Sequence, residues 1–194
     1  MTIGITSPRV YSFAYYSTGP FKGLLQSVTD PLSRTTAYEY DGAERIITEI
    51  DSDGKIIRYT YDEDGNLTSL TPPSNSEHTF AYNILDLQSS YVSPDVGLAG
   101  HTTDYTYNQD QQLDLLTRPD GKTIDFQYDS IGRMSVIDAD GEIYTYGYSS
   151  TTGLLTSISD PSGGLLSFTY DGRLLLTSTL ASIVTGKQIG RAHV

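Results

Sequence analysis

Ten residues about a third of the way along the chain, Tyr59 to Thr68, read YTYDEDGNLT and decide the fold. Tyr59 and Tyr61 are two residues apart, so their side chains share one face of an extended strand, because side chains alternate between the faces of a strand. Asp62 follows directly, and Gly65 comes three residues later. Aspartate bonds its own turn and glycine adopts positive φ without strain. A leucine and threonine run then starts again, so the segment predicts a β-hairpin.

The same pattern recurs along almost the whole chain. Eight pairs of aromatic residues separated by one residue recur in phase, and their second members lie 20 to 25 residues apart. These pairs contain 16 of the 21 aromatic residues. The chain is therefore predicted to be all-β, a continuous series of hairpins of about 21 residues. The pairs are Phe13/Tyr15, Tyr38/Tyr40, Tyr59/Tyr61, Phe80/Tyr82, Tyr105/Tyr107, Phe126/Tyr128, Tyr146/Tyr148 and Phe168/Tyr170.

Turn residues complete each repeat. A short polar residue follows most pairs and a glycine follows in several copies; Asp41, Asp62, Asp129, Asp171, Gly65 and Gly132 are the examples that define the repeat. Because the aspartates recur with the repeat, we expect them to serve turns rather than one active site. A second turn signal, such as Asp160-Pro161, closes the unit.

One detail departs from strict alternation. Apolar residues three apart follow several turns at the same offset from the tyrosine, namely Leu67/Leu70, Leu113/Leu116 and Met134/Ile137. A β-bulge explains this spacing. A first apolar residue that closes the hairpin end explains it as well, and both explanations stay open.

The composition excludes several classes of protein. The 194-residue chain has 12 Lys and Arg against 24 Asp and Glu, a net charge of −12, and no cysteine. Ser and Thr contribute 46 residues and Gly 18, which disfavours helical and α/β folds. Without cysteine there is no disulfide framework or thiolate zinc site, and the acidic balance argues against nucleic acid as a partner. No apolar run approaches about 18 residues, so we expect no membrane span.

The pattern aromatic-x-Tyr-Asp-x-x-Gly-(Asn/Arg)-Leu-Thr resembles the YD repeats, also called RHS repeats. Tyr59–Thr68 and Phe126–Met134 match this pattern well, and the resemblance covers roughly residues 10–180. It implies a curved sheet that spirals into a hollow shell. Such shells occur in bacterial polymorphic toxins, insecticidal toxin complexes, wall-associated proteins and teneurins. In toxins of the family the shell encloses a C-terminal effector.

The resemblance sets the expected domain organisation. Residues 1–9 are a lead-in, residues 10–180 are repeats, and residues 80–104 are a degenerate part in which Asp86 replaces the turn glycine. Residues 181–194 fit no repeat, and their last six match the translation of a common sequencing adapter. We therefore expect a non-native tail on a piece of a longer protein. The signature that ends bacterial shells, Asp-Pro-x-Gly-x-x-Gly-Gly, does not occur.

Candidate chemistry is sparse. Asp pairs precede glycine at Asp51-Ser52-Asp53-Gly54 and in two other turns, and turn formation or a weak calcium site explains them, although a complete EF-hand ligand set is missing. His78 and His101 lie in no zinc or nucleophile motif. We therefore expect no enzyme, no catalytic residue, no cofactor and no metal.

The tyrosines leave two functions open. Stacked across strands they form packed cross-strand pairs, or they form an exposed platform for sugar rings. The resemblance implies a structural shell wall with other repeats and an effector domain of the parent chain as partners. The alternative is an adhesion module that binds glycans or a surface receptor. Met1–Gly4 opens no secretion signal, so a secreted or cell-surface location rests on the resemblance.

Overall fold

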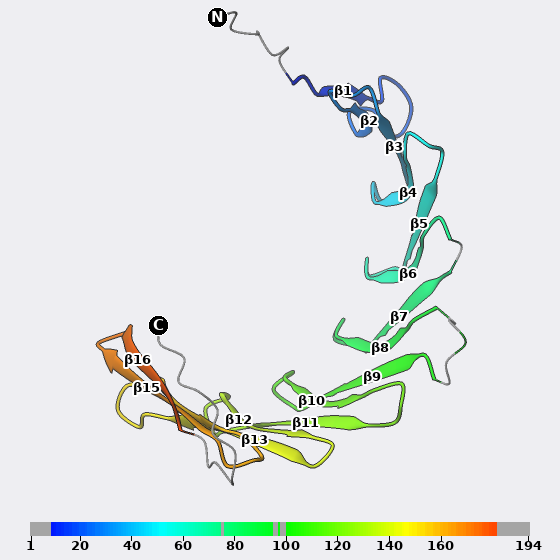
Figure 1. Ribbon diagram of the computed structural model, residues 1–194. Coiled ribbons are helices and arrows are strands. Elements are labelled where there is room, and N and C mark those ends of the chain that lie inside the picture. The colour runs from blue at the N-terminus through cyan, green and yellow to red at the C-terminus, as the bar shows by residue number, and fades with distance from the viewer. Residues whose placement is uncertain (1–8, 75, 95–96, 98–99, 182–194) are drawn as a thin grey trace, which may run out of the picture. The chain divides into compact units, whose positions relative to one another are not determined.

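The computed structural model of the chain describes residues 9–74, 76–94, 97 and 100–181 (Figure 1). Regular secondary structure in these residues consists of sixteen β-strands without a helix, which confirms the predicted all-β class. The predicted lead-in and tail lie almost entirely outside the described residues, and the predicted domain boundaries stay a prediction.

The chain divides after Thr102 into two compact units. The first contains β1 (Ser12–Tyr15), β2 (Leu25–Thr29), β3 (Thr35–Tyr40), β4 (Ile46–Ile50), β5 (Ile56–Tyr61), β6 (Leu67–Thr71), β7 (His78–Tyr82) and β8 (Gln88–Val92). The second contains β9 (Thr102–Tyr107), which begins at the boundary, β10 (Leu113–Thr117), β11 (Thr123–Tyr128), β12 (Met134–Ala139), β13 (Glu142–Tyr148), β14 (Leu155–Ser159), β15 (Leu165–Asp171) and β16 (Leu174–Ala181).

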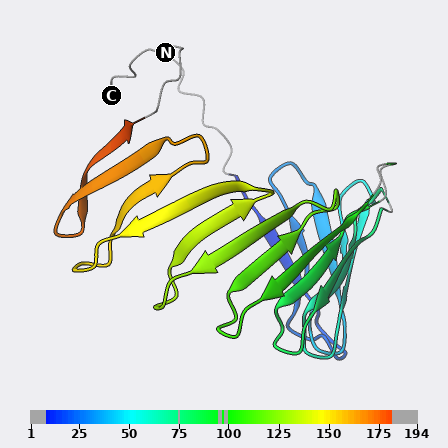
Figure 2. The same cartoon turned by 90° about the horizontal axis from the view of Figure 1, so that it is seen from below.

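Within each unit every strand pairs antiparallel with the next strand in the chain. Each unit is therefore an open meander, and Figure 2 shows the strands of the second unit following one another from green to orange. Each predicted repeat is one hairpin, from β1–β2 to β15–β16. The aromatic pair lies at the end of the first strand of the hairpin.

The two faces of the sheet differ as alternation requires. In β5, Ile57, Tyr59 and Tyr61 are half-buried, whereas Arg58 and Thr60 are exposed. We call the side that carries the paired aromatic residues the aromatic face. The opposite side carries hydroxyl pairs, such as those from Thr60 Oγ1 to Thr68 Oγ1 at 2.9 Å and to Ser69 Oγ at 2.8 Å, and we call it the hydroxyl face.

A β-bulge lies opposite the second tyrosine. Tyr61 pairs with Leu67 and Thr60 with Ser69, so Thr68 has no partner in the register. The same one-residue shift occurs in the β9–β10 and β11–β12 hairpins. The three-residue spacing of the apolar residues therefore comes from a bulge. It keeps both Leu67 and Leu70 on the aromatic face.

Five of the turns after the aromatic pairs share one geometry even where glycine is missing, whereas the turns after Ser149 and Asp171 have their positive-φ glycine at other positions, Gly153 and Gly172. The amide of Asp62 donates to the carbonyl of Asn66, and the amide of Gly65 donates back to the carbonyl of Asp62. The third residue after the polar one adopts positive φ, 97° at Gly65. Glu44, Asp86 and Gln111 occupy this position in other repeats with φ of 64°, 58° and 63°. The degenerate copy therefore retains the turn, with aspartate tolerating a conformation that favours glycine.

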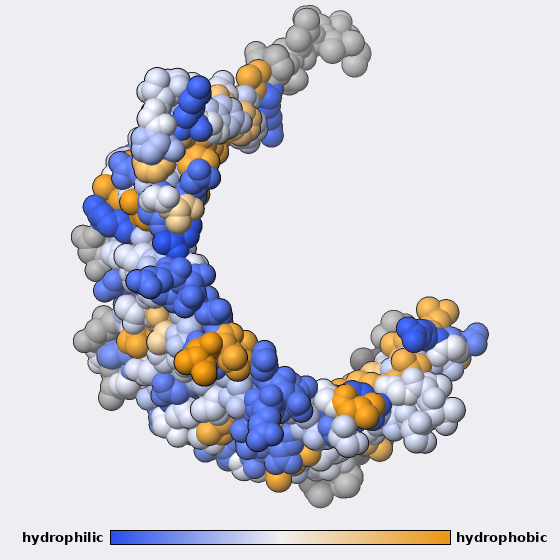
Figure 3. All heavy atoms as spheres, turned by 180° about the vertical axis from the view of Figure 1, so that it is seen from behind, coloured by the Kyte–Doolittle hydropathy of each residue, from blue (hydrophilic) through white to orange (hydrophobic). Residues whose placement is uncertain are grey.

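No conventional core exists in the described residues. No hydrophobic side chain there is fully buried, and Ser69, with 6% of its surface exposed, is the buried polar residue. In the face shown in Figure 3, hydrophobic residues lie in small groups among polar ones. Each unit is a single-layered sheet, so its stability depends on the contacts between neighbouring hairpins.

Candidate functional site

The contacts that join one hairpin to the next begin with a tyrosine hydroxyl. In five repeats the second tyrosine donates a hydrogen bond to the carbonyl of the residue that starts the second strand of the preceding hairpin. The pairs are Tyr40 to Leu25 at 2.7 Å, Tyr61 to Ile46 at 2.8 Å, Tyr82 to Leu67 at 3.0 Å, Tyr128 to Leu113 at 2.8 Å and Tyr148 to Met134 at 2.8 Å. The hydroxyl therefore links consecutive repeats.

Sequence reasoning missed this hydroxyl contact although a signal for it was present. The first position of the pair is Tyr or Phe, whereas the second is Tyr in all eight copies. An apolar packing role alone would tolerate phenylalanine at both positions. The restriction to tyrosine indicates a need for the hydroxyl group.

The turn aspartates bind backbone amides. Oδ1 of Asp129 accepts hydrogen bonds from the amides of Ile131 and Arg133, each at 3.0 Å, and Oδ2 accepts one from Arg133 Nε at 2.7 Å. Asp41 makes the same contacts with its own turn. Asp62 accepts from the amide and side chain of Asn66, while Asp171 ends β15 beside a shorter turn.

The residue four positions after the turn aspartate reaches the next hairpin. Arg45 Nη1 donates to the carbonyl of Asp62 at 2.9 Å, and its guanidinium carbon lies 4.6 Å from the centre of the Tyr61 ring. Arg133 repeats this arrangement with the carbonyl of Gly153 at 3.2 Å and with the Tyr148 ring at 4.2 Å. Elsewhere Asn66 donates to Asp86 Oδ1 at 2.9 Å, and Gln112 donates to the carbonyl of Gly132 at 2.7 Å.

We call this set of contacts between two hairpins the repeat junction. It consists of the second tyrosine, the turn carboxylate and the side chain four residues after that carboxylate. At Tyr61 and Tyr148 the junction brings together a hydroxyl donor, a guanidinium and an aromatic ring, and Asn66 and Gln112 provide amide donors at two other junctions. The junction positions backbone and ring, and it aims no nucleophile or acid–base pair at a common point.

The first aromatic residues pack across the strands of their own hairpins. In five hairpins the register partner is aliphatic or aromatic: Tyr59 faces Leu70, Phe80 faces Tyr91, Tyr105 faces Leu116, Phe126 faces Ile137 and Tyr146 faces Ile158. Tyr38 and Phe168 face the polar residues Glu49 and Ser178. These rings are half-buried. In β1, by contrast, Phe13 and Tyr15 have 57% and 56% of their surface exposed.

Two groups of titratable side chains have shifted pKa values. Burial raises the pKa of the Tyr40, Tyr59, Tyr82, Tyr107 and Tyr128 hydroxyls. The hydrogen bond from the Arg45 amide lowers the pKa of Asp41, and that from the Arg133 amide lowers the pKa of Asp129. For Asp62, burial opposes the shift, but hydrogen bonds from Asn66, Gly65 and Asp64 lower the pKa overall.

These shifts predict a stability plateau bounded at both ends of the pH scale. The raised tyrosine pKa values contribute stability that is fully present below about pH 10 and is lost as the pH rises through the folded values. The lowered aspartate pKa values contribute stability above about pH 4 that is lost as the pH falls through the folded values. Urea midpoints measured across this range check both limbs, and Tyr128→Phe should make the alkaline limb shallower. A midpoint that rises above pH 10 would contradict the tyrosine assignment.

In the acidic turn at Asp51, the carboxylate binds backbone amides of the turn. Oδ1 of Asp51 accepts from the amides of Asp53 and Lys55 at 2.8 Å and 2.9 Å. Among the described residues, no group of three or more His, Asp or Glu is arranged to hold a metal ion. His78 stacks on Tyr91 and its Nδ1 lies 2.7 Å from the Tyr91 hydroxyl.

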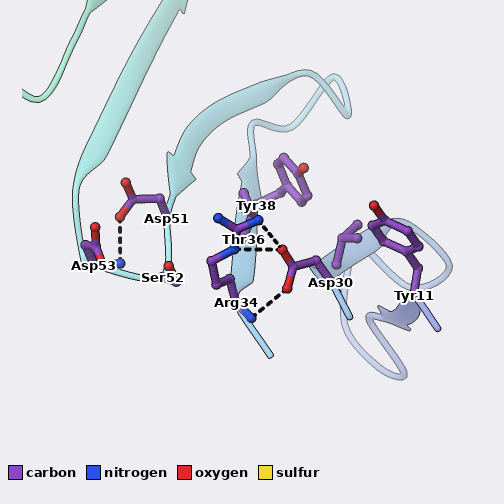
Figure 4. Close-up of a pocket in the computed structure, with 9 residues that line it drawn as sticks. Tyr11, Asp30, Arg34, Thr36, Tyr38, Asp51, Ser52 and Asp53 are labelled. Carbon is purple, nitrogen blue, oxygen red and sulfur yellow. Dashed lines mark hydrogen bonds and ion pairs between the residues drawn. The ribbon is translucent and has the colours of Figure 1, made fainter. Parts of the chain in front are cut away.

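An open hollow lies at turns of the first unit, and Figure 4 shows the residues that line it. Its volume is about 480 Å³. Tyr11 and Tyr38 line it together with polar turn residues. Arg34 and Asp30 in its wall form an ion pair at 2.6 Å.

No helix in the described residues is long and apolar enough to cross a membrane.

Comparison with known proteins identifies the family. The Teneurin YD-shell family model matches residues 7–190. The double-stranded DNA deaminase toxin A of Burkholderia cenocepacia (strain H111) is 30% identical over 148 residues, which are 76% of this chain and 10% of the toxin.

Two solved structures share the fold. The crystal structure of TcdB2-TccC3-Cdc42 has a TM-score of 0.66 at 20% identity and covers 91% of this chain and 11% of its own. The structure of the Photorhabdus luminescens Tc holotoxin pore has a TM-score of 0.63 at 22% identity, and the match covers 77% of this chain and 9% of that chain. The chain thus spans about a tenth of the length of these relatives. The family match over residues 7–190, on a chain built from repeated aromatic-x-tyrosine hairpins, shows that the chain belongs to the teneurin YD-shell family.

Proposed function

We propose that this chain is a non-enzymatic segment of a shell wall that encloses or displays another part of its parent protein, namely a C-terminal effector. One observation carries the proposal. Each unit is a single-layered sheet in which no described hydrophobic side chain is fully buried, while junctions join hairpin to hairpin. Such a sheet extends by adding repeats, as a wall does, and forms no closed globule around a core of its own.

The relatives support this function. One is named as a toxin and another is a Tc holotoxin pore, and in each the matched region is a small part of a long chain. Other repeats and an effector of the same parent chain are therefore the proposed partners. A secreted or cell-surface location belongs to the same proposal.

The junction tyrosines support the wall over an open sugar platform. Tyr61 and Tyr128 are half-buried, and their hydroxyls already donate to backbone carbonyls. A sugar platform needs exposed rings with a free polar tip. Glycan or receptor binding therefore has less support than a structural wall.

Photo-crosslinking in the parent protein tests the proposal. Benzoylphenylalanine is placed at Tyr105 on the aromatic face, at Thr106 on the hydroxyl face and, as a control, at the fully exposed turn residue Ile84. A wall that encloses an effector should crosslink to it from one of the two faces and not from the other or from Ile84. Equal crosslinking from both faces, or none to the parent chain, would reject enclosure. A glycan array probed with this chain checks the adhesion alternative.

A further inference from the structure

The junction between the β13–β14 and β15–β16 hairpins lacks the arginine of the junction before it, and Leu24 and Leu87 are leucines at the same place in two earlier hairpins. Leu154 takes the place that Arg133 holds one repeat earlier, since each directly precedes the residue that pairs with the second tyrosine of its hairpin. Leucine offers no donor and no charge to the next turn. In the described residues this junction therefore has no cation over the tyrosine ring that follows it, that of Tyr170.

The turn glycines differ in what lies beside them. A Cβ atom on Gly65 would lie 3.8 Å from Arg45 Nη1, and one on Gly153 would lie 3.6 Å from Arg133 Nη1. A Cβ atom on Gly172, the turn glycine that follows Tyr170, would have no other atom within 4 Å. Arg45 and Arg133 thus lie beside the turn glycine of the next hairpin, whereas open space lies beside Gly172 in its shorter turn.

A hollow occupies this space. Its volume is about 300 Å³, and it lies between Ser149, Thr152 and Leu154 on one hairpin and Phe168, Tyr170 and Gly172 on the next. The lining combines aromatic rings with hydroxyl groups. It therefore offers a surface for stacking and acceptors for hydrogen bonds within the reach of one side chain.

We propose that this hollow binds the guanidinium group of an arginine side chain presented by another polypeptide segment. The chain itself provides the precedent, because Arg133 lies 4.2 Å from the Tyr148 ring centre and donates to the carbonyl of Gly153. A planar guanidinium stacks on an aromatic ring and donates in several directions, whereas an ammonium is a compact and strongly hydrated charge. The exposed Asp171 and the net charge of −12 favour a cation.

A titration of the whole chain tests the site. The probes are Nα-acetyl-arginine amide and, as a matched control, Nα-acetyl-lysine amide, followed by amide NMR shifts. The arginine probe should cause saturable shifts confined to residues 149–156 and 166–173, and it should bind about two- to fivefold more tightly than the lysine probe. Shifts without saturation, or equal affinity for the two probes, would overturn the proposal.

Three substitutions test the site by filling it, keeping it or creating a second one. Leu154→Arg provides the guanidinium within the chain and should abolish the shifts, while Leu154→Met keeps an apolar side chain and should retain them. Arg133→Leu recreates the hollow one junction earlier and should add a second set of saturable shifts around Tyr148 and Gly153. Retained binding in a folded Leu154→Arg protein would contradict the site. If Leu154→Arg does not fold, a lack of new shifts in Arg133→Leu would contradict it instead.

Discussion

Replacing Tyr128 with alanine is expected to lower the free energy of unfolding by about 2–4 kcal/mol. The substitution removes a half-buried ring that faces Met134 and a hydroxyl that donates to the carbonyl of Leu113 at 2.8 Å. A fully buried aromatic residue would cost about 3–5 kcal/mol. The smaller value follows because one side of the single-layered sheet leaves the ring partly in water.

Phenylalanine separates the contribution of the ring from that of the hydroxyl. Tyr128→Phe should cost about 1 kcal/mol, the usual net value of one hydrogen bond. Tyr105→Phe is the matched control, because Tyr105 belongs to the first position, at which other copies carry phenylalanine. Urea denaturation of the three variants measures these differences, with glycan binding measured in parallel. Unchanged stability of Tyr128→Ala together with lost glycan binding would favour the adhesion alternative.

Replacing Gly132 with valine is expected to lower the free energy of unfolding by about 2–3 kcal/mol. Gly132 has φ of 83°, a conformation that a β-branched residue adopts only with strain. The new side chain also meets its neighbour across the junction, because a Cβ atom would lie 3.4 Å from Gln112 Nε2. That nitrogen donates to the carbonyl of Gly132, so the substitution strains the turn and displaces the junction contact.

The opposite substitution is available one repeat earlier. Gln111 occupies the same turn position with φ of 63°, so Gln111→Gly should raise the free energy of unfolding by about 1 kcal/mol. Thermal or urea denaturation of both variants, with Gly132→Ala as an intermediate case, gives the comparison. A stable Gly132→Val protein would show that the turn does not require positive φ.

The hairpins were predictable because their determinants are local. Tyr59 and Tyr61 share a face through strand periodicity, and the aspartate and glycine that follow specify the turn. The bulge at Thr68 was not decidable from the sequence, because a bulge and a closing residue produce the same three-residue spacing. The register partner of Tyr61 decides it, and this partner is known only from the structure.

The junctions were not predictable in detail because they connect different repeats. The bond from Tyr61 to Ile46 spans 15 residues and that from Arg45 to Asp62 spans 17. No local sequence pattern predicts which residue of the next hairpin an arginine side chain will contact. The sequence does show that the second position is always tyrosine. It does not show the acceptor of the hydroxyl, because any residue type can supply a backbone carbonyl.

The direction of the junction hydroxyl bonds bears on how the chain is made. In each of the five bonds the later hairpin brings the donor and the earlier hairpin provides the carbonyl. A hairpin that has just left the ribosome therefore finds the acceptor of its tyrosine hydroxyl already fixed on the preceding hairpin, while Arg45, Arg133 and Gln112 wait there as donors to its carbonyls. Because strands pair with their neighbours in sequence, no hairpin has to wait for a distant segment. Synthesis from the N-terminus can extend the sheet one hairpin at a time, with each completed hairpin acting as the template for the next.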